Sequence, residues 1–331
     1  MELPANVAEA FTQFRSAEFG TLARDGVAVA VPLSPLWQPA TERFLVTTGI
    51  GLPYKAYHAR RWPRVSLLLS NPTGSGMRDS AAVLVQGDAT VSDLTTWDDD
   101  LAEFWPWLFA RQPASTTAAA GLFYRHGLPW YYQRLKIHIV PERVRYWPGL
   151  DMAGAPQEVI LPARAGAPAA PGPASPGPAA PADTAAFDRL ARAIGRFPVP
   201  RLTVLEASGY PASTLCPAVP DSGDRVLRLD VPGWLGASAG PASLMSHRHD
   251  EKLWNLAGFL ARGVLEADDA GWLFRPTAYV TLSGPKPAEL LGFVRGSRRA
   301  ARAHLQRRQT PPPPTPWHKL AAARKKARHS A

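Results

Sequence analysis

The sequence contains a single cysteine, Cys216, which excludes an internal disulfide and a cysteine-based zinc cluster. No run of about 18 or more apolar residues occurs, so the sequence predicts no membrane-spanning helix. The stretch "MELPANVAEAFTQFRSAEFG" lacks the basic leader and the apolar core of a secretion signal. We therefore expect a cytoplasmic protein without a membrane partner.

Acidic residues are absent from residues 290–331, which hold eleven Lys and Arg. The whole chain has a net charge of +10, so the rest of it is close to neutral. The basic segment could bind nucleic acid, an anionic surface or an acidic partner. The alternative is a solvated tail that aids solubility. Because the segment is rich in charge and poor in apolar residues, we expect a chain cut after Pro287 to keep a folded core.

Two changes in composition divide the chain. Residues 161–183 form a Pro/Ala/Gly tract typical of an extended linker, and "SGPKP" at 283–287 marks a second break. An apolar content of 46% is enough for real cores on both sides of the linker. We expect a first domain over residues 1–150, a linker over 151–184, a second domain over 185–284 and a basic, helical and Pro-rich tail over 285–331.

Short strands dominate the pattern of the first domain. Asp25-Gly26 is a tight-turn pair, and apolar residues alternate after it at Val27, Val29 and Val31, which predicts a hairpin. Further strands are expected over "RFLVTT", "RVSLLLS" and "AAVLVQGDATV", two more over "LKIHIVPERVRYW", and helices over "LPYKAYHARRW" and "TTWDDDLAEFWPWLFA". Strands that do not alternate regularly with helices favour a mostly antiparallel barrel over a nucleotide-binding parallel sheet.

The acidic triplet Asp98, Asp99 and Asp100 lies in the first turn of the second expected helix. Three carboxylates could bind a metal, but acidic residues also complement the positive end of a helix, and we favour that role. His247 and His249 in "SHRHDE" have the spacing of a metal-binding pair. No third ligand is identifiable, so no metal site is predicted.

The second half of the sequence resembles the first. "FGTLARDGVAVAVPLSP" aligns with "RLTVLEASGYPASTLCP", which puts Gly26 on Gly209. "RVSLLLSNP" aligns with "PASLMSHRH", and "LVQGDATVSD" aligns with "LARGVLEADD", which puts Gly87 on Gly263. The sequence therefore predicts an internal duplication.

Four stretches of residues 8–150 together resemble the pyridoxamine 5′-phosphate oxidase-like, FMN-binding split barrels: "LARDGVAVAVPL", "FLVTTGIGLPYKAYHARRWPRVSLLL", "VQGDATV" and "KIHIVPERVRYW". The second repeat resembles them only weakly. The resemblance implies a mainly β (α+β) fold of two tandem split β-barrels with appended helices. Because such proteins are usually homodimers with the cofactor at the subunit interface, we expect the repeats to form a pseudo-dimer within one chain, itself a monomer or a dimer.

The resemblance also implies which residues bind FMN. A phosphate needs a cation and several hydrogen-bond donors, and Lys55, Thr47 and Thr48 would supply them. The strand Val31, Pro32, Leu33 and Ser34 would line the isoalloxazine ring. Further candidates for anionic parts of the cofactor are Arg60, Arg61 and Arg64.

The function implied is that of an FMN-dependent oxidoreductase acting on an unidentified small molecule. The flavin would do the redox chemistry, so no catalytic side chain is predicted. One alternative is a deazaflavin cofactor, whose acidic tail would suit the three arginines. A haem-binding or haem-degrading barrel that uses His318 is a second, and a non-enzymatic binding module with a basic tail is a third.

The second repeat lacks the residues of the first site. Its segment "LDVPGWLGASAGPAS" has no Lys or Arg, and Asp230 takes the position of Thr47. A carboxylate at that position would repel a phosphate. We therefore expect one cofactor per chain, with the second half-barrel serving as a wall of the first pocket.

Overall fold

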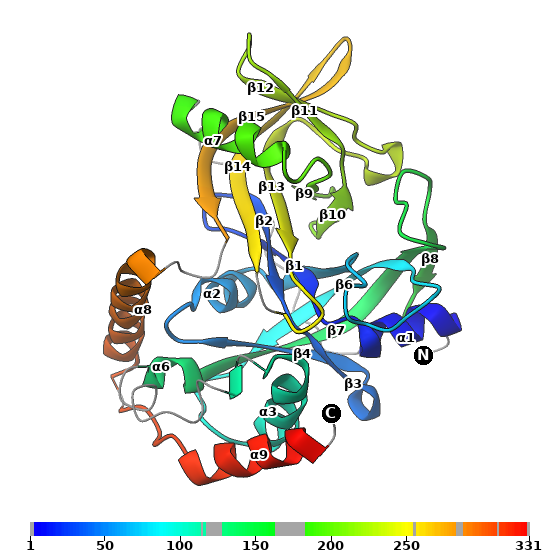
Figure 1. Ribbon diagram of the computed structural model, residues 1–331. Coiled ribbons are helices and arrows are strands. Elements are labelled where there is room, and N and C mark those ends of the chain that lie inside the picture. The colour runs from blue at the N-terminus through cyan, green and yellow to red at the C-terminus, as the bar shows by residue number, and fades with distance from the viewer. Residues whose placement is uncertain are drawn as a thin grey trace.

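The computed structural model describes residues 3–113, 115–116, 128–162, 183–253, 256–282, 287–309 and 311–329. These residues form two antiparallel sheets, one above the other in Figure 1, with helices around them. Most of the expected Pro/Ala linker lies outside the described residues. Among the helices that the structure does describe, none is long and apolar enough to cross a membrane.

The lower sheet of Figure 1 belongs to the first repeat. In spatial order its strands are β2 (Ala28–Leu33), β1 (Ala17–Leu22), β5 (Arg64–Leu69), β6 (Ala82–Val91), β7 (Arg134–Trp147), β4 (Arg43–Gly49) and β3 (Leu36–Gln38). An eighth strand, β8 (Gln157–Ile160), pairs with β7, so part of the expected linker is a sheet edge.

The upper sheet belongs to the second repeat and has the same strand order. Its strands are β10 (Pro211–Leu215), β9 (Arg201–Leu205), β13 (Gly240–Arg248), β14 (Ala257–Asp268), β15 (Gly271–Thr281), β12 (Val226–Leu229) and β11 (Ala218–Asp221). Each strand therefore has a counterpart in the lower sheet. The mainly β fold of two tandem split barrels expected from the sequence is confirmed by this shared topology.

Paired glycines occupy the same special positions in both repeats. Gly26 and Gly209 turn the β1–β2 and β9–β10 hairpins with φ of 81° and 82°, a conformation that glycine adopts without strain. Gly87 and Gly263 lie at β-bulges, where an added Cβ would come within 2.1 Å of the Val140 carbonyl oxygen and 2.3 Å of the Arg275 carbonyl oxygen. The alignment of the repeats is therefore correct at both pairs.

The helices lie mostly around the lower sheet. They are α1 (Ala5–Gln13), α2 (Tyr54–Arg61), α3 (Asp99–Arg111) and α6 (Pro129–Tyr132), with α7 (Thr184–Ile194) on the upper sheet. Two short 3-10 turns, η1 (Pro39–Thr41) and η2 (Gly233–Leu235), complete the repeats. Asp98 caps α3 through the Leu101 N–H, as its position before an apolar helix predicts. The stretch expected to form two closing strands is one continuous strand, β7, which bends at the bulge instead of breaking.

The basic C-terminal segment is packed against the first repeat, so its interpretation as a solvated tail is wrong. It forms α8 (Pro287–Arg308) and α9 (Trp317–His329), at the left and bottom of Figure 1. Leu320, Ala323 and Ala327 of α9 are buried against α3 in a core with Trp105. These apolar side chains are spaced along one helix face, and the charged residues between them face solvent.

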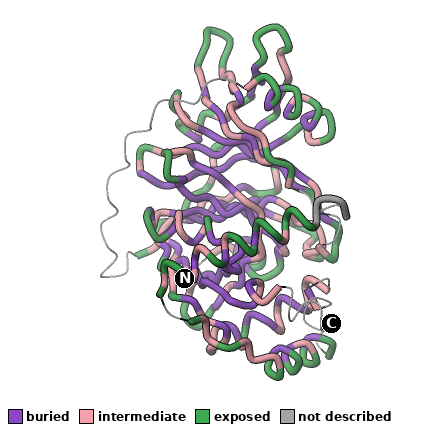
Figure 2. Tube along the Cα trace, turned by 90° about the vertical axis from the view of Figure 1, so that its left-hand side faces the viewer, coloured by how far each residue is buried: buried purple, intermediate pink, exposed green. Residues whose placement is uncertain are grey.

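The two repeats share a core. The cluster inside the upper sheet includes Leu68, Leu84 and Trp147 from the lower one. Hydrogen bonds also cross between the repeats, from the Trp62 indole to the Gly209 carbonyl (2.9 Å) and from the Ser243 hydroxyl to the Ala28 carbonyl (2.8 Å). Figure 2 shows buried residues through both sheets and exposed ones at the hairpin tips and outer helices. These contacts between the two repeats, which we call the seam, hold the end of β13 beside β1 and β2.

Candidate functional site

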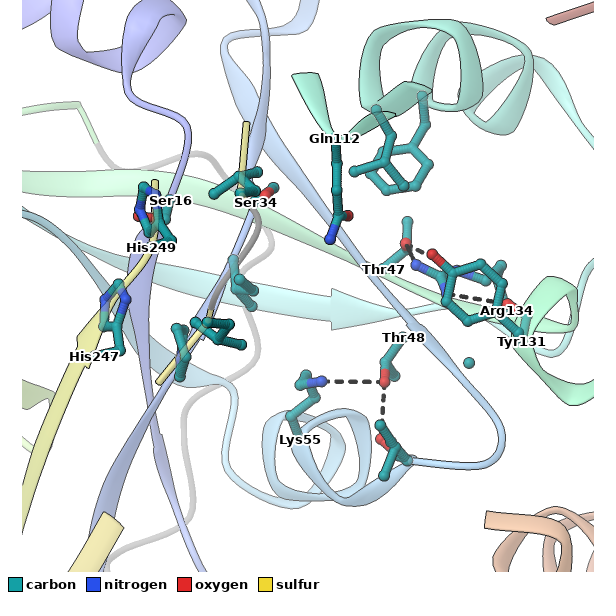
Figure 3. Close-up of a pocket in the computed structure, with 18 of the residues that line it drawn as sticks. Ser16, Ser34, Thr47, Thr48, Lys55, Gln112, Tyr131, Arg134, His247 and His249 are labelled. Atoms are coloured by element: carbon teal, nitrogen blue, oxygen red, sulfur yellow. Dashed lines mark hydrogen bonds between the residues drawn. The ribbon is translucent and has the colours of Figure 1, made fainter. Parts of the chain in front are cut away.

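A pocket of about 320 Å³ lies where the lower sheet, α2, α3 and the segment after β13 meet. Its size is in the range of small-molecule and cofactor sites. Figure 3 shows polar side chains on both sides of the pocket. His247, His249 and Ser16 lie on the left, and Arg134 and Tyr131 lie on the right. The lining residues are Ser16, Pro32, Leu33, Ser34, Thr47, Thr48, Gly49, Leu52, Lys55, Phe104, Leu108, Gln112, Trp130, Tyr131, Arg134, His247, His249, Leu253 and Leu256.

Lys55 projects from α2 toward the end of β4. Its Nζ donates to the Thr48 hydroxyl at 3.3 Å, and that hydroxyl donates to the Leu52 carbonyl at 2.8 Å. Burial, together with the positive charge of Arg134, lowers the pKa of Lys55 to about 8. The lysine is therefore a desolvated cation held at the wall of the pocket.

Arg134 is the second cation of the pocket and is only 6% exposed. It begins β7, which pairs with β4 and so brings its guanidinium to Thr47. Its Nε and Nη2 donate to the Thr47 hydroxyl at 3.0 and 2.5 Å, and its Nη1 donates to the Tyr131 carbonyl at 3.0 Å. The guanidinium also lies over the Trp105 and Tyr131 rings, each 5.2 Å from its carbon. Burial lowers the pKa of Arg134.

No carboxylate within the described residues pairs with Lys55 or Arg134, and the pocket lining contains no Asp or Glu. Lys136, two residues after Arg134 in β7, shows the contrast. Its Nζ lies 2.7 Å from Asp98 and 2.5 Å from Asp100. Leaving two desolvated cations without a counter-charge is costly unless a ligand supplies the negative charge. This part of the pocket has the charges and hydrogen-bond donors that an anion needs.

Six of the ten residues expected at a cofactor site line this pocket: Pro32, Leu33, Ser34, Thr47, Thr48 and Lys55. Val31 lies beside them in β2 and packs against the core of the lower sheet. Their roles toward a cofactor stay predictions, but the structure does bring them together.

The three arginines Arg60, Arg61 and Arg64 lie outside the pocket lining. Arg60 donates to the Ser92 carbonyl at 2.8 Å, and Arg61 donates to the Leu22 carbonyl at 3.1 Å. Arg64 crosses the seam and donates to the Ser208 carbonyl at 2.8 Å. Each therefore has a backbone partner elsewhere, and a role in ligand binding stays a prediction for all three.

Sequence reasoning missed Arg134 and underrated the histidines. The only sequence signal that could have indicated Arg134 was its position at the start of a strand. Its approach to Thr47 depends on the register between β4 and β7, which the sequence does not reveal. His249 accepts from or donates to the Ser16 hydroxyl at 2.8 Å, and His247 Nε2 lies 2.8 Å from the Glu18 carboxylate. The second repeat thus contributes side chains to a pocket formed mainly by the first, as expected of a wall.

His138 and Trp130 have contacts that a structural role explains. His138 Nε2 lies 2.9 Å from Asp100, within the ion-pair cluster of α3. Trp130 lines the pocket and covers Gly51, where an added Cβ would lie 2.3 Å from the indole. His318, the candidate haem ligand, is exposed on α9 and does not line the pocket.

Comparison with solved structures gives several distant similarities. General stress protein 26 from Bacillus anthracis str. Sterne is 17% identical, and the match covers 47% of this chain and 96% of that one with a TM-score of 0.32. A putative pyridoxamine 5′-phosphate oxidase from Listeria innocua is 20% identical over 45% of this chain and 100% of its own, with a TM-score of 0.30. An F420 reductase is 16% identical over 43% and 98% of the two chains, also with a TM-score of 0.30.

No protein-family model matches the sequence, and no curated protein matches it. The similar structures include proteins of the class that the sequence resembles. Similarities this distant do not establish what the chain binds, and the case for a ligand rests on the pocket itself.

Proposed function

We propose that the chain is a flavoprotein that binds FMN in this pocket and acts as an oxidoreductase on a small molecule. One observation carries the proposal: Lys55 and Arg134 both line the pocket, near enough for the charge of Arg134 to lower the pKa of Lys55, with no carboxylate partner among the described residues. A phosphate dianion is the group that best satisfies two cations together with the hydroxyls of Thr47 and Thr48. The resemblance of residues 8–150 to FMN-binding split barrels selects FMN among phosphate-bearing ligands.

The described residues fit the cofactor. Lys55 and Arg134 would hold the phosphate, and Pro32 and Leu33 of β2, with Ser34 just after it, would lie along the ring. When bound, FMN supplies the capacity to accept or donate a hydride or electrons. The chain itself contributes the anion site, the apolar walls that exclude water and the histidine-bearing end that faces a second ligand.

The test compares two arginines, one inside the pocket and one outside. Arg134→Met should release FMN, whereas Arg228→Met, a change on β12 of the second repeat at a side chain that is 46% exposed, should leave it bound. The released chromophore is identified by its mass and visible spectrum, and its content per chain is measured for each variant. Equal FMN content in both variants would refute the site. Release of a deazaflavin or of haem would refute FMN and select the corresponding alternative.

A further inference from the structure

The end of the pocket farthest from Arg134 is a polar cluster made by both repeats. Ser16, the residue before β1, places its hydroxyl 2.8 Å from His249 Nε2, and Asn71 places its amide Nδ2 3.3 Å from the same nitrogen. Ser16 and His249 both line the pocket (Figure 3). We call Ser16, Asn71 and His249 the polar end.

The hydrogen bonds fix the tautomer of His249. Its Nδ1 lies 2.8 Å from the backbone carbonyl of Asp250, which can only accept, so Nδ1 carries the hydrogen. Burial lowers the pKa of His249, and the ring is therefore neutral near pH 7. Nε2 is then a bare acceptor that faces two donors.

Charges behind the polar end are balanced. His247, whose ring stacks on His249 at 5.8 Å, binds the buried Glu18 carboxylate, and Arg201 pairs with that carboxylate at 3.0 Å. The positive charge of Arg201 and the negative charge of Glu18 cancel next to the rings. The exposed Asp250 carboxylate also acts on His249, but it lies outside the pocket lining, which contains no Asp or Glu and no Lys or Arg other than Lys55 and Arg134.

Asn71 makes the Ser16 hydroxyl available to a ligand. The Asn71 side-chain oxygen accepts the Thr73 N–H at 3.1 Å, so its NH₂ group is directed at His249. If the Ser16 hydrogen rotates away, His249 Nε2 still has a donor and no buried acceptor is left unsatisfied. The hydroxyl can therefore turn toward an acceptor in the pocket at little cost.

We propose that the polar end is the substrate subsite and that Ser16 donates its hydrogen to the carbonyl oxygen of a small, uncharged, largely apolar molecule. The proposal rests on the proposed function, because it assumes that the cofactor phosphate occupies the opposite end. Leu33, Leu253 and Leu256 supply the apolar walls that such a molecule needs. A charged substrate would lack a counter-charge at this end, whereas a neutral carbonyl needs only the donor that Ser16 offers.

The experiment measures the binding of acetophenone and of ethylbenzene, a probe of similar shape without the oxygen, by titration calorimetry. The wild-type protein should prefer acetophenone by roughly threefold to tenfold, the effect of one net hydrogen bond. Ser16→Ala should remove the preference. Gln112→Ala, which deletes a side-chain amide elsewhere in the same lining, should keep it. Asn71→Ala should reduce the preference, because Ser16 must then stay with His249.

An equal preference for acetophenone in the wild type and in Ser16→Ala would overturn the proposal, as would no preference in the wild type. FMN content is measured in every variant and should be unchanged by Ser16→Ala. Loss of FMN from Ser16→Ala would place Ser16 at the cofactor and also overturn the subsite. Absence of FMN from every protein, the wild type included, would refute the proposed function, while the two affinities would still test the subsite.

Discussion

Replacing Lys55 with methionine should make the apoprotein more stable and its FMN binding weaker. Burial lowers the pKa of Lys55 from 10.5 to about 8, so keeping the ammonium charged in the folded apoprotein costs about 3 kcal/mol. At pH 7 the lysine is charged in both the folded and the unfolded chain, and the full cost is present. Methionine fills similar space without the charge, and Lys55→Met should raise the free energy of unfolding by up to that amount.

The stability gain expected for Lys55→Met depends on pH. Between pH 8 and 10.5 the unfolded chain keeps the Lys55 proton that the folded chain has lost, so the wild-type apoprotein gains stability as pH rises through this window. The stability advantage of Lys55→Met should therefore shrink above pH 8 and vanish above 10.5. FMN affinity of the wild type should fall above pH 8, because binding then requires a proton to be taken up first.

The assays are urea unfolding of the apoproteins at two pH values and a fluorescence titration with FMN. Loss of a charge-assisted bond to phosphate is worth about 1.5–3 kcal/mol, so Lys55→Met should bind FMN roughly tenfold to a hundredfold more weakly. Lys136→Met is the matched control. It removes a lysine that is paired with Asp98 and Asp100 and should destabilise the protein. The hypothesis that Lys55 is a desolvated cation that binds the FMN phosphate would be refuted if the Lys55→Met apoprotein were less stable than the wild type, or if its FMN affinity were unchanged.

Three further outcomes are expected. Titration of the apoprotein with FMN should saturate near one equivalent per chain, and two equivalents of equal affinity would contradict a single site. Deleting residues 288–331 should lower the free energy of unfolding by about 3 kcal/mol or more, because Leu320 and its neighbours lose their packing; unchanged urea unfolding would contradict this. Gly51→Ala should displace Trp130, at a cost of about 1–3 kcal/mol, and weaken FMN binding, whereas Gly154→Ala, where an added Cβ meets nothing within 4 Å, should not.

Features set by local backbone geometry could be predicted from the sequence. Gly26 and Gly209 mark the same hairpin turn, and Gly87 and Gly263 mark the same bulge, since few residues other than glycine fit there. These pairs gave the duplication and hence the architecture. Lys55, Thr47 and Thr48 were identified through the resemblance to FMN-binding split barrels, because one of the resembling stretches carries all three residues.

Features set by packing between distant segments could not be predicted in this way. Arg134 reaches Thr47 only because β7 pairs with β4 in one register, and nothing in the sequence near Arg134 states that register. The tail was misjudged because its buried positions are small or sparse. Ala323 and Ala327 give little apolar signal among many basic residues, yet together with Leu320 they pack α9 against α3.

The two repeats differ at the elements that deliver the cations. In the first, α2 lies between β4 and β5 and bears Lys55, while α3 and α6 lie between β6 and β7 and lead into Arg134. In the second, the three-residue turn η2 takes the place of α2, and a tight turn of Asp269 and Ala270 joins β14 directly to β15. A shared sheet topology therefore does not imply a shared site, because both cations depend on helices that the second repeat lacks at these positions. What the second repeat retains is the strand β13, and the segment at its end brings His247 and His249 to the pocket of the first repeat.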